Sequence, residues 1–299
     1  MTTARLNLVL LAVAVGLFTL LAVDERQEQA ALAKAIEAQP PLTPLDADAI
    51  RRIRLANPGS PDIVLEKTGS GWQLREPVAL AADLVKVGDL TALATRETRG
   101  AIDTTVARRA DLGLDPPRST ITLDDLSLAL GEIEPLKRAR YIERNPGLAD
   151  AEVRLVDEFA LEPFDGEYTD LVNKALLPHD AEIVALSAPG LELVRDAASG
   201  VWAARPASAA ATPDAIAALL AAWHEIRAQA TLPPLADVDA DAAADVRVRL
   251  ADGTALGYRL VDRAGSRFLQ RLDLPVSYQF LPADADRLLR LSPPAAPAP

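Results

Sequence analysis

Hydrophobic and polar positions follow the same order in two stretches of this chain. Each stretch opens with two short segments in which apolar and polar residues tend to alternate, as in half-buried strands. These segments are 48–55 and 63–67 in the first stretch and 180–186 and 191–195 in the second. A glycine and a tryptophan follow each pair, as Gly71-Trp72 and as Gly200-Val201-Trp202. We therefore expect a β-hairpin at the start of each stretch.

One helix and then several strands are predicted next in each stretch. Apolar residues recur at helical spacing over 82–96 and again over 214–226. The second helix has a clear start at Thr212-Pro213, because threonine can cap a helix and proline suits its first turn. Each helix is followed by segments that predict an antiparallel meander: 120–123, 126–130, 140–143 and 153–156 in the first stretch, and 246–250, 256–261, 267–270 and 276–280 in the second.

The N-terminal segment has a different pattern. Leu6 to Val23 is an uncharged apolar run that would span roughly 27 Å as a helix, close to the bilayer's hydrocarbon thickness of about 30 Å. Arg5 precedes the run and Asp24 follows it, so the positive-inside rule places the N-terminus in the cytoplasm. A cleaved signal peptide is the alternative, although no small-residue cleavage pattern precedes Asp24. We expect an uncleaved transmembrane helix.

These patterns together predict an α+β protein. Two tandem, diverged repeats are expected, each an antiparallel β-sheet made of a hairpin and a meander and covered by one helix. The predicted segments are a transmembrane anchor at 1–24, a stalk and linker at 25–45, the first repeat at 46–160, a helical connector at 161–179 with its helix at 169–177, the second repeat at 180–291 and a disordered tail at 292–299.

Composition narrows the possible partners and chemistry. The net charge of −12 argues against nucleic-acid or anionic-membrane binding, since both require a clustered positive surface. The chain has no cysteine, which excludes disulfides, thiolate metal sites and cysteine nucleophiles. Aromatic residues make up 4%, so aliphatic side chains must form most of the core.

Individual candidates for a chemical site are weak. The only histidines are His179 and His224, and a helical zinc motif would need a third at the position of Ala228. The acidic run 237–241 resembles the start of a calcium loop but lacks its glycine and its final glutamate. Ser70 and the pair Asp124-Asp125 are better explained as turns. No catalytic, cofactor-binding or metal-binding residue is predicted.

Basic and aromatic residues are also assigned structural roles. The clusters Arg51-Arg52-Arg54 and Lys137-Arg138-Arg140 lie on predicted strands, and we expect solvated sheet faces there. Trp72 and Trp202 hold equivalent places in the two repeats, and we expect core residues that lock hairpin to helix.

Several short motifs in this order resemble the uncharacterised bacterial family called domain of unknown function 4340. The matching segments are Ile50–Leu55, Leu65–Lys67, Gly71-Trp72 with Pro77, Ala82-Asp83, Leu112–Pro117, Asp170-Leu171 and Lys174–Leu177. Val172-Asn173 departs from the charged residues more usual before Lys174. Within these motifs we expect structural roles for Gly71, Gly113 and Pro116.

The resemblance implies an envelope protein often encoded beside ABC-type transporters similar to the gliding-motility exporters. It implies no catalytic residue, because none is known for the family. We therefore expect a non-enzymatic, periplasmic accessory or scaffold subunit, anchored in the bacterial inner membrane. Its expected partner is an ABC-type permease or another envelope protein. The alternative is a small-ligand-binding module or hydrolase that uses a cleft between the repeats.

Overall fold

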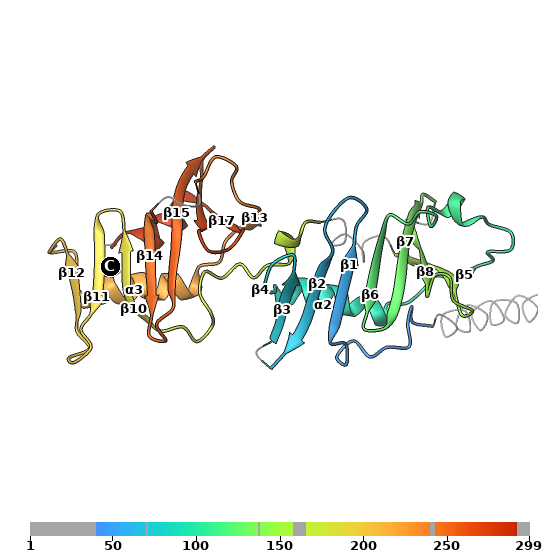
Figure 1. Cartoon of the computed structure of the whole chain (residues 1–299), viewed down its shortest axis with the longest axis horizontal. Helices are drawn as coiled ribbons and strands as arrows, with labels where there is room; N and C mark the ends of the chain where they lie inside the picture. The colour runs from blue at the N-terminus through green and yellow to red at the C-terminus, as the bar shows by residue number, and fades with distance from the viewer. Residues whose placement is uncertain (1–39, 70, 137, 158–165, 240–242, 292–299) are drawn as a thin grey trace, which may run out of the picture. The chain divides into compact units, whose positions relative to one another are not determined.

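The computed structural model describes residues 40–69, 71–136, 138–157, 166–239 and 243–291 (Figure 1). This part of the chain is mostly antiparallel β-sheet, arranged as two sheets with few helices. The predicted anchor, most of the stalk and the predicted tail lie outside these residues. None of the helices in the described ranges is long and apolar enough to span a membrane.

The described residues fall into two compact units. Unit 1 draws them from 1–49, 91–120 and 125–161, and unit 2 from 50–90, 121–124 and 162–299.

The first sheet has the strand order β4-β3-β2-β1-β6-β7-β8-β9-β5. Its strands are β1 (Arg52–Ala56), β2 (Ile63–Thr68), β3 (Gly71–Glu76), β4 (Leu80–Ala81), β5 (Ala101–Ile102), β6 (Ser119–Leu123), β7 (Leu126–Glu134), β8 (Ala139–Arg144) and β9 (Glu152–Asp157). The helical elements of this part are α2 (Leu84–Ala92), with the 3₁₀ turns η1 (Leu93–Thr95) and η2 (Arg109–Leu112).

The second sheet has the order β12-β11-β10-β14-β15-β16-β17-β13. Its strands are β10 (Ile183–Ala188), β11 (Leu191–Arg195), β12 (Trp202–Arg205), β13 (Ala230–Leu232), β14 (Val246–Leu250), β15 (Ala255–Arg263), β16 (Ser266–Arg271) and β17 (Ser277–Phe280). Its helices are α3 (Pro213–Glu225) and α4 (Pro282–Leu289).

The two sheets have the same strand order once β4 is set aside. Strands β3-β2-β1-β6-β7-β8-β9-β5 correspond in turn to β12-β11-β10-β14-β15-β16-β17-β13. The helix that precedes the last edge strand is α2 in one case and α3 in the other. This agrees with the repeat that the sequence pattern predicts.

Packing in each sheet follows the alternation seen in the sequence. In β14, Val246, Val248 and Leu250 are buried while the two arginines between them are exposed. On the hairpins, Leu65 is paired with Ile53 and Leu193 with Leu186, and all four side chains are buried. Burial of one face of a strand fixes its register, because a slip by one residue would expose that face.

Helix α3 begins as predicted and covers part of the second sheet (Figure 1). The Thr212 side chain accepts a hydrogen bond from the Ala215 amide at 3.2 Å, and Pro213 occupies the first turn. Trp223 of α3 lies with its ring centroid 5.8 Å from that of Tyr258 on β15. Its indole N–H donates to the Leu288 carbonyl of α4 at 2.8 Å.

The prediction of a connector helix at 169–177 is wrong. Only the turn η5 (Tyr168–Leu171) is helical, and the chain then runs extended. Its backbone groups bond to other elements: the Leu171 carbonyl accepts from Asp83, the Asn173 amide donates to Ala81, and the Lys174 carbonyl accepts from Ala228. These bonds replace those that a helix would have made within itself.

Candidate functional site

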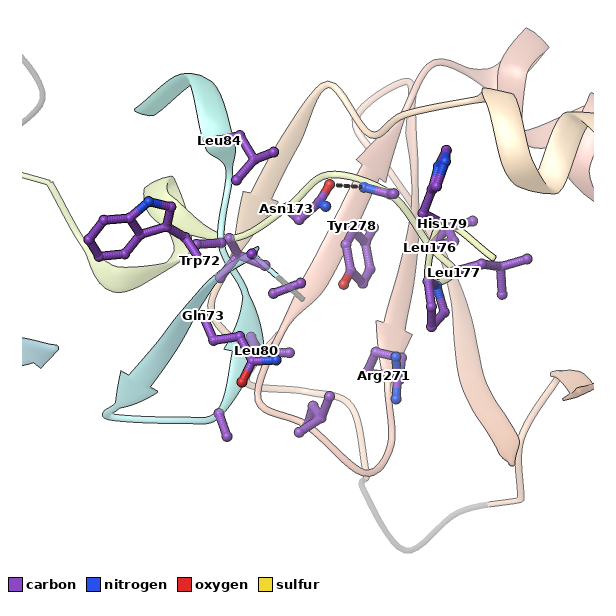
Figure 2. Close-up of a pocket in the computed structure, with 18 of the residues that line it drawn as sticks. Trp72, Gln73, Leu80, Leu84, Asn173, Leu176, Leu177, His179, Arg271 and Tyr278 are labelled. Carbon is purple, nitrogen blue, oxygen red and sulfur yellow. Dashed lines mark hydrogen bonds between the residues drawn. The ribbon is translucent and has the colours of Figure 1, made fainter. Parts of the chain in front are cut away.

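A cavity of about 520 Å³ lies within unit 2 (Figure 2). Its walls come from β3, β4 and the start of α2, from the connector at 172–180, and from the region of β16 and β17. Apolar side chains predominate, among them Leu80, Leu84 and Leu176. A few polar groups share this lining, as in most small-molecule sites.

Tyr278 and Arg271 lie on one wall of the cavity, whose other polar lining residues are Gln73, Asn173, His179 and Asp180. Tyr278 lines the cavity with only 3% of its surface exposed. Figure 2 shows its hydroxyl pointing into the space between Leu80 and Arg271. Burial raises the pKa of the Tyr278 phenol, and the positive charge of Arg271 opposes that rise. The group is therefore a neutral O–H donor at physiological pH.

Arg271 is held in place by its neighbours. Its Nε and Nη2 donate to the two carboxylate oxygens of Asp273 at 2.7 and 2.6 Å. Its guanidinium carbon lies 5.6 Å from the centre of the Tyr258 ring. The hydroxyl of Tyr258 is fully buried and donates to the Leu176 carbonyl at 3.0 Å. The guanidinium is thus fixed at the cavity wall rather than free to swing into solvent.

The predicted core tryptophans are not core residues. Trp72 and Trp202 are each only half-buried, whereas Trp223 is the tryptophan with 1% exposure. Trp72 borders the cavity, but its indole ring points away from Tyr278 (Figure 2). Trp202 lines a separate cavity of about 370 Å³ with Val201, Ile216 and Leu220. Each lies on a strand at or near the edge of its sheet, where little chain remains to cover a large ring.

The two sheets differ at the edge beside these tryptophans. In the first sheet, β3 is covered by β4, which pairs Gln73 with Ala81 and Leu74 with Leu80. In the second sheet, β12 is the corresponding strand and pairs with β11 alone among the described residues. An unpaired strand edge is a template for another strand. The edge of β12 is therefore a second candidate site.

A buried polar position occurs at the same place in both sheets. The strands β8 and β16 contain Arg-Tyr-Ile-Glu-Arg (140–144) and Arg-Phe-Leu-Gln-Arg (267–271). Glu143 and Gln270 hold the fourth place, and each has 3% of its surface exposed. Neither residue stands out in its own repeat. Aligning the two repeats strand by strand would have found them, because the five-residue pattern recurs.

Each of these buried residues holds a loop. Arg109 Nη2 lies 2.8 Å from Glu143 Oε2, an ion pair without hydrogen-bond alignment. Burial raises the pKa of Glu143, and Arg109 lowers it. Gln270 Oε1 accepts from the Leu235 amide at 2.8 Å and from Ser277 Oγ at 3.3 Å. The neutral amide of Gln270 binds a loop just as the carboxylate of Glu143 does. We therefore assign this position a structural role.

The residues weighed as possible chemical sites in the sequence do not come together in the described part of the structure. His179 is exposed at the rim of the first cavity, and His224 is exposed near the end of α3. Asp237 forms an ion pair with Arg263, while Asp241 and Ser70 lie outside the described residues. Asp124 and Asp125 form the predicted turn between β6 and β7, and Asp124 Oδ1 also accepts from the amides of Arg51 and Arg52 at 3.0 and 2.9 Å. In the described part of the chain, no group of three His, Asp or Glu side chains is placed to hold a metal ion.

The prediction that the basic clusters are solvated is confirmed for the first cluster and wrong for part of the second. Arg51, Arg52 and Arg54 are exposed, as predicted. Arg140 is buried instead, and its Nη1 donates to the Gly131 carbonyl at 2.9 Å. The prediction of a solvated face is wrong there, because β7 has an irregular register between Leu130 and Ile133 that brings this carbonyl to the guanidinium.

Gly113 has a steric reason to be glycine. Its φ is +68°, and a Cβ there would lie 2.6 Å from Glu132 Cγ and 2.8 Å from the Glu132 amide. Gly71 also has a positive φ, of +110°, but open space around it. Pro116 follows the turn η2 in the same loop, where Leu114 and Pro117 form an isolated bridge.

Comparison with known families places the chain. The model of the family described as Domain of unknown function (DUF4340) matches residues 72–250, more than half of the chain. The chain belongs to this family. No curated protein and no solved structure matches it. The match spans β3 through β14, and so includes Trp72, the Gly113 loop, Glu143 and the connector.

Proposed function

We propose that this DUF4340 protein is a non-enzymatic accessory subunit of the bacterial envelope. Residues 6–23 anchor it in the inner membrane, and the two sheets extend into the periplasm. It acts by contact with another protein, in the first instance the permease of an ABC-type transport system. The transporter association rests on the family resemblance, whereas the mode of contact rests on the edge of β12.

The first sheet indicates what fits on this edge. Trp72 and Trp202 correspond, since they are paired with Lys67 of β2 and Arg195 of β11. The Trp72 carbonyl accepts a hydrogen bond from the Ala82 amide, next to β4, at 3.1 Å. The backbone groups of residues 202 and 204 therefore face the side where β12 has no partner strand among the described residues, because backbone direction repeats every second residue.

Apolar surface lies beside this edge. Val201 is 64% exposed, and the neighbouring cavity is lined by Trp202, Ile216 and Leu220. An added strand would gain main-chain hydrogen bonds from β12 and specificity from an aliphatic side chain in that cavity. The occupant we propose is an extended segment of the partner protein with one aliphatic side chain, equivalent to Leu80 of β4.

Purification from membranes tests this proposal. The tagged full chain is solubilised in detergent and its partners are identified by mass spectrometry, in parallel with Ala204→Pro and Ala204→Val variants. Proline removes the amide donor of residue 204, whereas valine keeps it. We expect a transporter subunit with the wild type and with Ala204→Val, and at least about tenfold less of it with Ala204→Pro. Equal capture by all three proteins would refute the edge as the contact, and recovery in the soluble periplasmic fraction would refute the anchor.

A small-ligand-binding module is the second candidate function. The observation that favours it is the cavity of about 520 Å³, which is within the range of about 300–1,000 Å³ common for ligand pockets.

A further inference from the structure

The hydroxyl of Tyr278 marks the cavity in unit 2 as a candidate binding site. Tyr278 has only 3% of its surface exposed, and its hydroxyl opens into the cavity, where no hydrogen bond joins it to another described residue. Tyr258, its neighbour in the same sheet, satisfies its own hydroxyl with the Leu176 carbonyl at 3.0 Å. The difference indicates that the Tyr278 donor serves something that enters the cavity.

The charge at the cavity wall suggests the sign of that group. Arg271 lines the cavity, while Asp273, which holds its guanidinium, is not among the described lining residues. Among the described residues that line the cavity, the one carboxylate is Asp180, which is exposed at the rim. A hydroxyl donor beside a fixed guanidinium is suited to an oxyanion, because hydrogen bonds to charged acceptors are about twice as strong as those to neutral ones.

The remaining lining sets the body of the ligand. Leu80, Leu84 and Leu176 provide aliphatic surface together with several alanines, and Gln73, Asn173 and His179 are the other polar side chains of the lining besides Asp180. An apolar body loses water contact on these walls, which stabilises the complex by roughly 25 cal/mol per Å² of apolar surface buried.

We propose that this cavity binds a small apolar carboxylate, with the carboxylate on the Tyr278 hydroxyl near Arg271 and the apolar body against Leu80 and Leu176. This inference is independent of the β12 edge, which lies at the other end of the strand order in the second sheet.

Titration calorimetry on the full chain in nanodiscs tests it with three probes that share one body. These are 3-phenylpropionate, 3-phenylpropan-1-ol and 3-phenylpropylamine, which differ only in their head group. We expect the carboxylate to bind with at least about tenfold higher affinity than the alcohol or the amine. Equal affinities for the three probes, or no binding of the carboxylate at millimolar concentration, would overturn the proposal.

The protein side is tested by removing one oxygen atom. Tyr278→Phe keeps the ring and the packing, and should weaken 3-phenylpropionate binding about tenfold or more. Tyr141→Phe is the matched control, since Tyr141 lies in unit 1, outside the cavity, and should leave binding unchanged. A Tyr278→Phe protein that melts at the wild-type temperature and binds the carboxylate with wild-type affinity would contradict the assignment. If Tyr278→Phe and Tyr141→Phe lose binding equally, 3-phenylpropionate does not bind in this cavity. The proposal then also fails.

Discussion

The strands β8 and β16 carry the same five-residue pattern but hold their loops by different chemistry. On β8, the carboxylate of Glu143 is paired with Arg109 of the loop that follows β5. On β16, the amide of Gln270 accepts from the backbone of Leu235, in the loop that follows β13. Both polar side chains are buried to the same degree. In both strands the fourth place of the pattern is a buried polar side chain that binds a loop, and a neutral amide serves there as well as a carboxylate.

The loops themselves close differently. In the first repeat, Gly113 lies against the backbone of Glu132, and Gly131 faces the Leu112 carbonyl so closely that an added Cβ would be 2.3 Å from it. In the second repeat, the contact at Gln270 is reinforced by Ser277. In the first repeat, the buried charge of Glu143 costs free energy to desolvate. The loop that it binds is also held by the close approach of Gly113 and Gly131 to neighbouring backbone.

The largest expected effect concerns helix packing. Trp223→Ala removes a buried ring and its hydrogen bond to Leu288, and should lower the free energy of unfolding by about 3–5 kcal/mol. Trp72→Ala and Trp202→Ala should each cost only about 1–2 kcal/mol, because both side chains are already partly exposed. Urea denaturation of the three variants checks this order. A Trp202→Ala protein as unstable as Trp223→Ala would show that the edge tryptophan has a core role after all.

The next largest effect concerns the loop of the first repeat. Gly113→Ala should cost about 2–4 kcal/mol, because a positive φ and a contact with the Glu132 backbone add together. Gly147→Ala is the matched control: its φ is +82° but nothing lies within 4 Å of the added Cβ. It should cost about 1 kcal/mol from the backbone conformation alone. Equal losses of thermal stability in both variants would mean that the loop shifts freely away from β7.

The smallest effect compares the two anchors directly. Gln270→Glu places a charge at a buried position whose cross-strand neighbour, Arg259, is already paired with Asp245, and should cost about 1–3 kcal/mol at pH 7. Glu143→Gln should instead change stability at pH 7 by about 1 kcal/mol or less, in the stabilising direction.

The pH dependence of these variants follows from the same burial. Because burial raises the folded-state pKa of Glu143 above its unfolded value, protonation favours the folded state. That contribution is fully present below the unfolded pKa of Glu and is lost as pH rises through the raised folded pKa. Glu143→Gln should therefore gain stability over wild type only above that window, as measured by urea denaturation from pH 4 to pH 8. A constant difference across this range would contradict the raised pKa.

Much of the fold could be predicted from the sequence because its signals are local. Alternation predicted β14 with its observed bounds, and the cap at Thr212 placed the start of α3 correctly. The two-residue strands β4 and β5, the three-residue strand β13 and the helix α4 were not predicted. Short edge strands have too few residues to show a period. The connector was mistaken for a helix, because its backbone partners are provided by Ala81, Asp83 and Ala228, far away in the sequence.

The family, the order of elements and the repeated plan can be read from the chain alone, since motif order and hydrophobic period are properties of a linear sequence. Which polar groups are buried, and which tryptophan lies in the core, depends on how distant segments pack. Tyr278 and Tyr258 have similar surroundings in the sequence, yet the hydroxyl of Tyr258 meets a carbonyl 82 residues away while that of Tyr278 faces a cavity. Whether a polar atom finds a partner depends on distant segments meeting in space, and a linear pattern does not record that meeting.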